Sequence, residues 1–167
     1  MNIIELIVKN AERFPDKSAI VFDDEALTYR DLVEQVRKLS NAFSRIGVKG
    51  GTFIGLLLNN SIEFVLSMLA AADLGATIVP MSSSLGRKDL LTAINFTGIE
   101  FIIGWHVTVK NILALSEGDF VLAHDHYVVV GGQVGSCLYF NDLLKFDSGG
   151  YELNNLGVDE NTDFILT

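Results

Sequence analysis

Several short stretches of this 167-residue chain hold residue types that could bind a ligand or react with one. Residues 131–135, Gly-Gly-Gln-Val-Gly, could cradle a phosphate group, because glycine lets backbone amides approach an anion closely. The stretch lacks the Lys-Ser/Thr pair of a P-loop, and no clear helical pattern follows it. A plain turn is therefore the favoured interpretation.

Two groups of histidines could take part in metal or acid–base chemistry. His124, Asp125 and His126 could offer two imidazoles and a carboxylate to a metal ion, and in a strand the two histidines would share a face. A third and a fourth protein ligand are not evident, which weighs against zinc. His106, beside Trp105 at the end of an expected strand, is interpreted as a packing or surface residue rather than a base.

The nucleophilic side chains carry no signature of catalysis. Cys137 has no adjacent cation in the sequence that would activate its thiol, and the serines at 82–84 lack the glycine-flanked elbow of a hydrolase. As Cys137 is the only cysteine, an intrachain disulfide is impossible, and we expect a cytoplasmic protein. We therefore predict no catalytic, cofactor-binding or metal-binding residue within this chain.

Charge and hydrophobicity argue against a nucleic-acid partner and against a membrane span. The formal net charge is −9, which disfavours nucleic acid because phosphate neutralisation requires clustered Lys and Arg. Although 49% of the residues are hydrophobic, the longest nearly unbroken apolar run, residues 64–72, is far shorter than the ~20 residues that span a bilayer. No membrane span is expected.

The clearest structural unit covers residues 50–80, which predict a strand, a helix and a second strand. Residues 52–58 are an apolar run typical of a strand buried on both faces. Asn60 is the expected N-cap of a helix over 61–74, with Glu63 three residues later as in a capping box. Gly75 would end the helix in a left-handed conformation, and Pro80 would end the strand over 76–79. The helix is apolar on nearly every side, which predicts burial all round.

Similar patterns organise the rest of the chain. A short amphipathic helix is expected over 2–13, and a hairpin over 18–29 with an acidic turn. Thr28, with Asp31 at the third helical position, predicts a capped helix that ends at Gly47. Further expected elements are helices over 86–96 (with Phe96 among the residues that could face the core) and 107–116, strands over 101–104, 120–123 and 127–130, a helical turn over 142–145, a loop over 154–162 and a strand over 163–167. Strand centres recur at equal intervals, which predicts a doubly wound, mostly parallel α/β sheet with helices on both faces, plus the N-terminal helix and hairpin.

Three stretches resemble a known family. Residues 57–64, Leu-Leu-Asn-Asn-Ser-Ile-Glu-Phe, and 71–80, Ala-Ala-Asp-Leu-Gly-Ala-Thr-Ile-Val-Pro, are similar to early core motifs of the adenylate-forming (AMP-binding) superfamily. That superfamily contains acyl-CoA synthetases, luciferases and the adenylation domains of peptide synthetases. Residues 27–32, Leu-Thr-Tyr-Arg-Asp-Leu, resemble its first core motif. The Asn-Ser-x-Glu-Phe element resembles the acyl-CoA synthetase branch more than the peptide synthetase branch, whereas Ser-Ser-Ser-Leu-Gly at 82–86 departs from the proline-containing turn of many members.

The resemblance implies an enzyme of which this chain is one part. The intact enzyme would be an AMP-forming acyl-CoA synthetase that uses ATP, Mg²⁺ and coenzyme A, with a role in fatty acid metabolism. In the family, a strand like that expected over 163–167 leads into the loop that binds the ATP phosphates. We therefore expect residues 1–167 to form a single α/β subdomain, truncated before that loop, which binds no cofactor and is inactive by itself.

Two expectations concern the partners of this subdomain. The missing remainder of the ligase would be one, and a homodimer through exposed apolar surface is another, because a helix that is apolar on all sides needs neighbours around it. The alternative is a standalone flavodoxin-like module that binds or interacts without catalysis.

Overall fold

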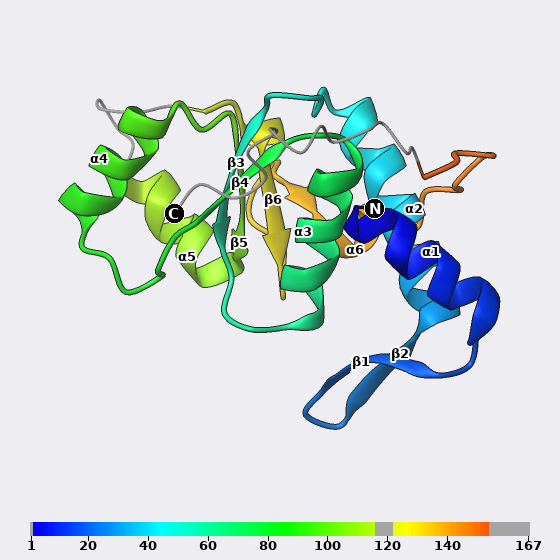
Figure 1. Ribbon diagram of the computed structural model, residues 1–167. Coiled ribbons are helices and arrows are strands. Elements are labelled where there is room, and N and C mark those ends of the chain that lie inside the picture. Colours follow the sequence, from blue (N-terminus) through cyan, green and yellow to red (C-terminus); the bar gives the residue numbers. More distant parts are fainter. Residues whose placement is uncertain (1, 116–121, 154–167) are drawn as a thin grey trace.

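The computed structural model describes residues 2–115 and 122–153. After an N-terminal helix and a hairpin, helices and strands alternate from α2 to α5 (Figure 1). In chain order they are α1 (Ile3–Arg13), β1 (Ser18–Phe22), β2 (Glu25–Thr28), α2 (Tyr29–Arg45), β3 (Phe53–Leu57), α3 (Ile62–Asp73), β4 (Thr77–Pro80), α4 (Arg87–Thr97), β5 (Phe101–Trp105), α5 (His106–Leu115), the 3₁₀ turn η1 (His124–His126), β6 (Tyr127–Val130), β7 (Leu138–Tyr139) and α6 (Phe140–Leu143).

Five strands form one parallel sheet in the order β4-β3-β5-β6-β7. The chain therefore leaves β3 toward β4 on one side and returns past β3 to β5 on the other. Helices cover both faces, with α2 and α3 on one side and α4 and α5 on the other (Figure 1). The doubly wound parallel sheet predicted from the sequence is confirmed.

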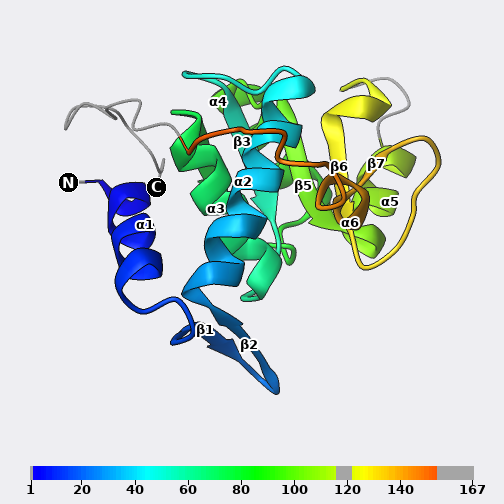
Figure 2. The ribbon, with the colours of Figure 1, turned by 90° about the vertical axis from the view of Figure 1, so that its right-hand side faces the viewer.

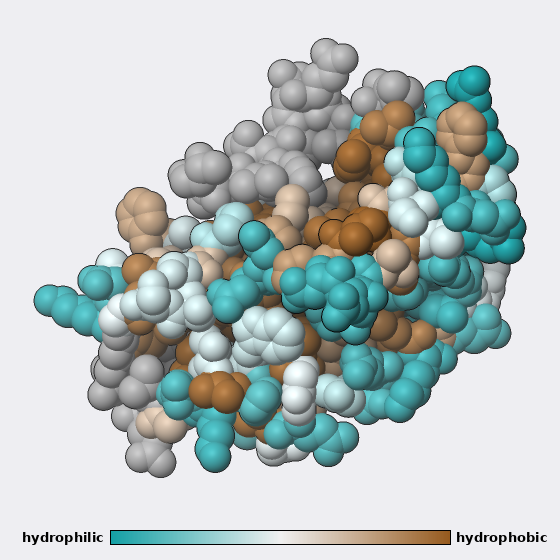
Figure 3. Space-filling view, turned by 90° about the horizontal axis from the view of Figure 1, so that it is seen from below, coloured by the Kyte–Doolittle hydropathy of each residue, from teal (hydrophilic) through white to brown (hydrophobic). Residues whose placement is uncertain are grey.

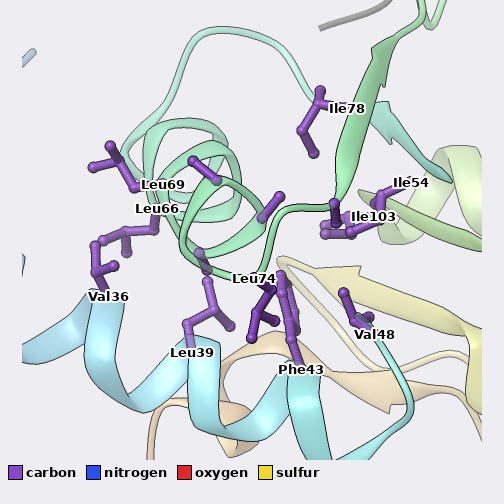
Figure 4. Close-up of a cluster of buried hydrophobic side chains, with 14 of the residues drawn as sticks. Val36, Leu39, Phe43, Val48, Ile54, Leu66, Leu69, Leu74, Ile78 and Ile103 are labelled. Carbon is purple, nitrogen blue, oxygen red and sulfur yellow. The ribbon is translucent and has the colours of Figure 1, made fainter. Parts of the chain in front are cut away.

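Side chains of the sheet alternate between two separate hydrophobic clusters, as the pleat requires. Ile54, Ile103 and Val128 belong to the cluster beneath α2 and α3, whereas Leu57 and Ile102 belong to the cluster beneath α4 and α5. Figure 4 shows the first cluster, in which side chains of α2 and α3 meet residues of the strands. Leucine and isoleucine on both faces explain why the strands are nearly continuous apolar runs.

The N-terminal elements agree with the sequence prediction. The Asn2 side chain caps α1 by accepting from the amide of Glu5 at 2.8 Å. The Thr28 hydroxyl caps α2 as predicted by accepting from the amide of Asp31 at 3.1 Å, and it also donates to the Asp31 carboxylate at 2.7 Å. The strands β1 and β2 pair as an antiparallel hairpin.

Two expectations about helices and one about a strand were wrong in part. Phe96 does not face the core, because it is 90% exposed while Leu90 and Ile94, one helical turn apart, cover the sheet. The helix α3 is not buried all round, since Ile62 and Met68 are only half-buried. The predicted strand over 120–123 is not found at Leu122 and Ala123, and residues 120–121 lie outside the described chain, as do the expected elements over 154–167.

An apolar groove separates α1 from α3 where the latter is less buried. It has a volume of about 440 Å³ and is lined by Asn2, Ile3, Ile4, Val65, Met68, Leu69 and Ala72. Figure 3, seen from below, shows brown side chains gathered in the part of the view that α1 and α3 occupy. No helix among residues 2–115 and 122–153 has both the length and the apolar composition needed to cross a membrane.

Candidate functional site

The carboxyl edge of the parallel sheet is the first place to search for a site. In open α/β sheets, ligands bind outside the carboxyl ends of the strands, where the strand order reverses. Here that point lies between the loop after β3 and the end of β5, the strand at its side. The strand β6 points down in Figure 1, and the β1–β2 hairpin lies at the same end of the molecule.

A cavity of about 400 Å³ lies at this edge. Two sets of residues line it. The connection after β3, the start of α3 and the end of β5 supply Asn60, Ser61, Ile62, Glu63 and Trp105, and the hairpin supplies Phe22, Asp23, Asp24 and Glu25. Four of these residues are acidic, and the lining includes no Lys or Arg from the described part of the chain. The side chains of this cavity therefore do not supply the positive charge that a triphosphate needs.

The helix α3 begins at this cavity with a cap that differs from the predicted one. Ser61, not Asn60, is the N-cap, and its hydroxyl accepts from the amide of Phe64 at 3.2 Å. Glu63 consequently lies at the second helical position, where it cannot close the capping box that was predicted. The error is one residue in register, since Asn60 and Ser61 both have side chains that can cap.

The glycine loop after β6 packs against aromatic rings. A Cβ at Gly131 would lie 3.1 Å from the Trp105 ring, and a Cβ at Gly132 would lie 3.1 Å from the His106 ring. Gly131 also has φ = +78°, a conformation that favours glycine. Close packing on Trp105 and His106 is thus sufficient to explain these two glycines without a phosphate.

His106 is the first residue of α5 and directly follows Trp105, which lines the cavity. Its Nδ1 atom is buried and has no hydrogen-bond partner among the described residues. The ring lies so close to Gly132 that a Cβ there would be 3.1 Å from it, so packing accounts for its position. The interpretation of His106 as a packing residue agrees with this geometry.

The histidines of η1 each bind a different protein group. The His124 Nδ1 atom is 2.8 Å from the Ser136 hydroxyl, and the His126 Nδ1 atom is 2.8 Å from the Glu100 carbonyl oxygen. The His126 ring also stacks on Phe101 with 4.4 Å between ring centres. Because residues 124–126 form a 3₁₀ turn, the strand geometry considered for a metal site is wrong. No group of three possible metal ligands occurs within the described residues.

Cys137 and the serines at 82–84 lie in surroundings that do not activate a nucleophile. Burial raises the pKa of the half-buried Cys137 thiol, which disfavours the reactive thiolate. The Ser82 and Ser84 hydroxyls lie 2.7 Å apart, and the Ser84 amide donates to the Ser82 hydroxyl at 3.2 Å. These serines form a polar loop, as the sequence indicates.

The hairpin turn and Trp105 share a cavity that the sequence patterns do not predict. The hairpin is far from β5 in the chain, and only the fold brings the two together. A second feature that these patterns do not predict is the buried Asp73, the last residue of α3, which is 1% exposed. The signal available was a charged residue within an otherwise apolar helix.

Comparison with known proteins identifies similar sequences and folds. The model of the AMP-binding enzyme family matches residues 7–146. Tyrocidine synthase 3 of Brevibacillus parabrevis is 33% identical over 147 residues, which cover 88% of this chain and 2% of the synthase. Bacitracin synthase 3 of Bacillus licheniformis is 25% identical over 131 residues, which cover 78% of this chain and 2% of that protein.

Solved structures agree at the level of the fold. The anthranilate CoA ligase AuaEII, in complex with anthranoyl-AMP, superimposes with a TM-score of 0.77 at 25% identity, covering 86% of this chain and 28% of the ligase. The N-terminal domain of FACL13 from Mycobacterium tuberculosis has a TM-score of 0.81 at 18% identity, covering 99% of this chain and 41% of that domain. The chain thus spans a small part of these curated relatives and less than half of these structures.

Proposed function

The chain belongs to the AMP-binding enzyme family, and from this premise we propose that it is the N-terminal part of an ATP-dependent carboxylate ligase of the acyl-CoA synthetase type. The observation that carries the proposal is the family match over residues 7–146 on a doubly wound sheet. The similarity to the ligase AuaEII, a protein in complex with anthranoyl-AMP, supports it.

The proposed reaction of the whole protein has two steps. A carboxylate oxygen attacks the α-phosphorus of ATP, which forms an acyl-adenylate and releases pyrophosphate. A thiol, proposed to be that of coenzyme A, then attacks the acyl carbon and releases AMP. Mg²⁺ would neutralise the phosphate charge during the first step.

The described residues do not offer a binding site for the phosphates of ATP. The cavity at the carboxyl edge is lined by carboxylates, and the glycine loop 131–135 packs on Trp105 and His106. We therefore assign no step of the reaction to a residue of this chain. We propose that residues 1–167 are one subdomain, that the catalytic residues belong to the remainder of the ligase, and that the chain by itself is inactive and binds no cofactor.

A second candidate is the adenylation domain of a peptide synthetase. The 33% identity to tyrocidine synthase 3 favours it, whereas the Asn-Ser-x-Glu-Phe element at 60–64 favours the acyl-CoA synthetase branch. The two candidates share the adenylation step and differ in the acid and in the thiol that accepts the acyl group. Fatty acids, amino acids and coenzyme A tested as substrates of the whole protein would separate them.

A standalone flavodoxin-like module is the alternative outside the family's chemistry. The sequence encoded after Thr167 tests it directly. A loop rich in Gly, Ser and Thr that contains a Lys supports the ligase, because such a loop places backbone amides and a cation on phosphates. A stop codon at that position would contradict the proposal that this chain is part of a larger ligase. A cytoplasmic location and a role in fatty acid metabolism belong to the same proposal, and cell fractionation tests the first.

A further inference from the structure

Residues 147–153 form a segment, here called the strap, that crosses the helices on one face of the sheet. Figure 2 shows it in orange as it runs from α6 across α2 toward α3. Gly149 and Gly150 have φ angles of +54° and +78°, and the Tyr151 amide donates to the Ser148 carbonyl oxygen at 2.6 Å. Two consecutive residues in this conformation specify a defined turn.

The first anchor of the strap is Asn41 in α2, which is 9% exposed. Its side-chain amide donates to the carbonyl oxygens of Asp147 at 3.0 Å and Ser148 at 3.5 Å. The Arg45 Nε atom donates to the Asn41 side-chain oxygen at 3.3 Å, which orients the amide toward the strap. A buried side chain thus satisfies backbone groups that are 106 positions away in sequence.

The second anchor is Asp73 at the end of α3. The Tyr151 hydroxyl donates to its Oδ2 atom at 2.8 Å. A carboxylate at the C-terminal end of a helix is disfavoured by the helix dipole, and burial of a charge is costly unless it is paired and hydrogen-bonded. A carboxylate at position 73 therefore does not stabilise α3 itself. Its hydrogen bond to Tyr151 of the strap explains why a carboxylate occupies this position.

The strap ends against α1. Tyr151 and Leu153 pack on the hydrophobic cluster beneath α2 and α3. Leu153 also lines a groove of about 230 Å³ whose other residues, Glu5, Val8, Lys9 and Glu12, belong to α1. The two polar anchors therefore bring the chain across α2 and α3 to the α1 side of the domain.

We infer that Asp73 and Tyr151 are positioning residues that dock the strap and so fix where, beside α1, the chain continues beyond Leu153. Buried polar groups can specify one packing arrangement at some cost in stability, and a buried carboxylate with a tyrosine partner from a distant segment is suited to that task. The relevance to catalysis rests on the proposed function, in which the phosphate-binding part follows the strap.

Amide hydrogen exchange in the 167-residue chain tests the docking. In Tyr151→Phe, we expect the Tyr151 amide to exchange roughly three- to tenfold faster, the range for loss of one hydrogen bond. Nuclear Overhauser contacts between Leu153 and α1 should weaken, while amides in the middle of α3 keep their rates. Tyr139→Phe is the matched control, because the Tyr139 hydroxyl accepts from Asn141, two positions away, at 3.2 Å and so makes a local contact.

A second comparison separates docking from general packing. Asp73→Asn retains an acceptor oxygen and should keep the strap protected, whereas Asp73→Leu should release it. Wild-type exchange rates in both Tyr151→Phe and Asp73→Leu would overturn the inference. Should Tyr151→Phe unfold the chain, the comparison of Asp73→Leu with Asp73→Asn decides the question by itself, and wild-type exchange rates in Asp73→Leu would then overturn the inference.

None of these measurements involves ATP or a carboxylic acid. Release of the strap by Tyr151→Phe would uphold the docking even if the ligase proposal fails. Intact docking in every variant would overturn the inference without affecting the family assignment.

Discussion

Replacement of Ser61 by alanine tests how the helix at the carboxyl edge begins. The Ser61 hydroxyl accepts from the Phe64 amide at 3.2 Å, and alanine removes this acceptor without adding volume. Ser61 is 8% exposed, so water has poor access to replace the lost bond. Asn60→Ala is the matched control, because Asn60 is the neighbouring residue with capping potential and is exposed.

The expected cost follows from the burial of the cap. Loss of a serine N-cap costs about 0.5–2 kcal/mol, and because Ser61 is buried and its bond to the Phe64 amide is only partly open to water, we expect the upper half of that range, about 1–2 kcal/mol. For a domain of this size, each kcal/mol lowers Tm by roughly 2–4 °C. Asn60→Ala should change stability by less than about 0.5 kcal/mol, as is usual for exposed positions.

Urea unfolding followed by circular dichroism measures both variants. We expect Ser61→Ala to lower the midpoint without changing the slope, because the surface exposed on unfolding is the same. If Asn60→Ala lowers the free energy of unfolding as much as Ser61→Ala or more, the assignment of Ser61 as the N-cap is refuted. Asn60 would then be the N-cap, as predicted from the sequence.

Three further predictions concern other parts of the chain. Burial and the hydrogen bond to Asp73 raise the pKa of Tyr151, so the stability it contributes is present below pH ~10 and lost as pH rises further; absorbance titration at 295 nm should show that Tyr151→Phe removes a phenol that ionises late. Gly75→Val should destabilise the chain more than Gly135→Val: both glycines have positive φ, but Gly75 is half-buried and in contact with the Gly50 backbone, where the two methyl groups of valine need room, whereas Gly135 is exposed. Equal losses of stability in thermal melts would contradict this. The groove between α1 and α3 should promote self-association, which sedimentation equilibrium at micromolar concentration detects and a monomer without hydrophobic-dye binding would disprove.

Local chemistry explains why most of the fold could be predicted from the sequence. Thr28 and Asp31 form the predicted cap, and Gly75 adopts the left-handed conformation expected after a helix, with φ = +67°. Apolar runs bounded by such signals predict strands buried on both faces, which the two clusters around β3 and β5 confirm. The predictions that were wrong concern register and orientation. The N-cap of α3 is Ser61, one residue after the predicted Asn60, and Phe96 lies on the solvent side of α4.

The site and the strap depend on contacts that sequence patterns do not encode. The hairpin turn meets Trp105 only in the folded chain, and Tyr151 reaches Asp73 across 78 positions. Residues 124–126 offer two imidazoles in sequence, yet Ser136 and the Glu100 carbonyl occupy their Nδ1 atoms. Pairings over such separations are set by the tertiary packing, so candidate ligands in a sequence cannot be assigned before their partners are known.

Carboxylate-dependent exchange of pyrophosphate into ATP is the most direct test of the central claim. It should be run side by side on residues 1–167 and on the protein extended by the residues encoded after Thr167, with fatty, aromatic and amino acids as substrates. The account predicts exchange by the extended protein with one of these classes of acid and none by residues 1–167. Hydrogen-bond donors that stabilise the developing phosphate charge lower the activation barrier by several kcal/mol, and the account places them outside residues 1–167. Exchange by residues 1–167 alone, or none by the extended protein with any acid, would contradict it.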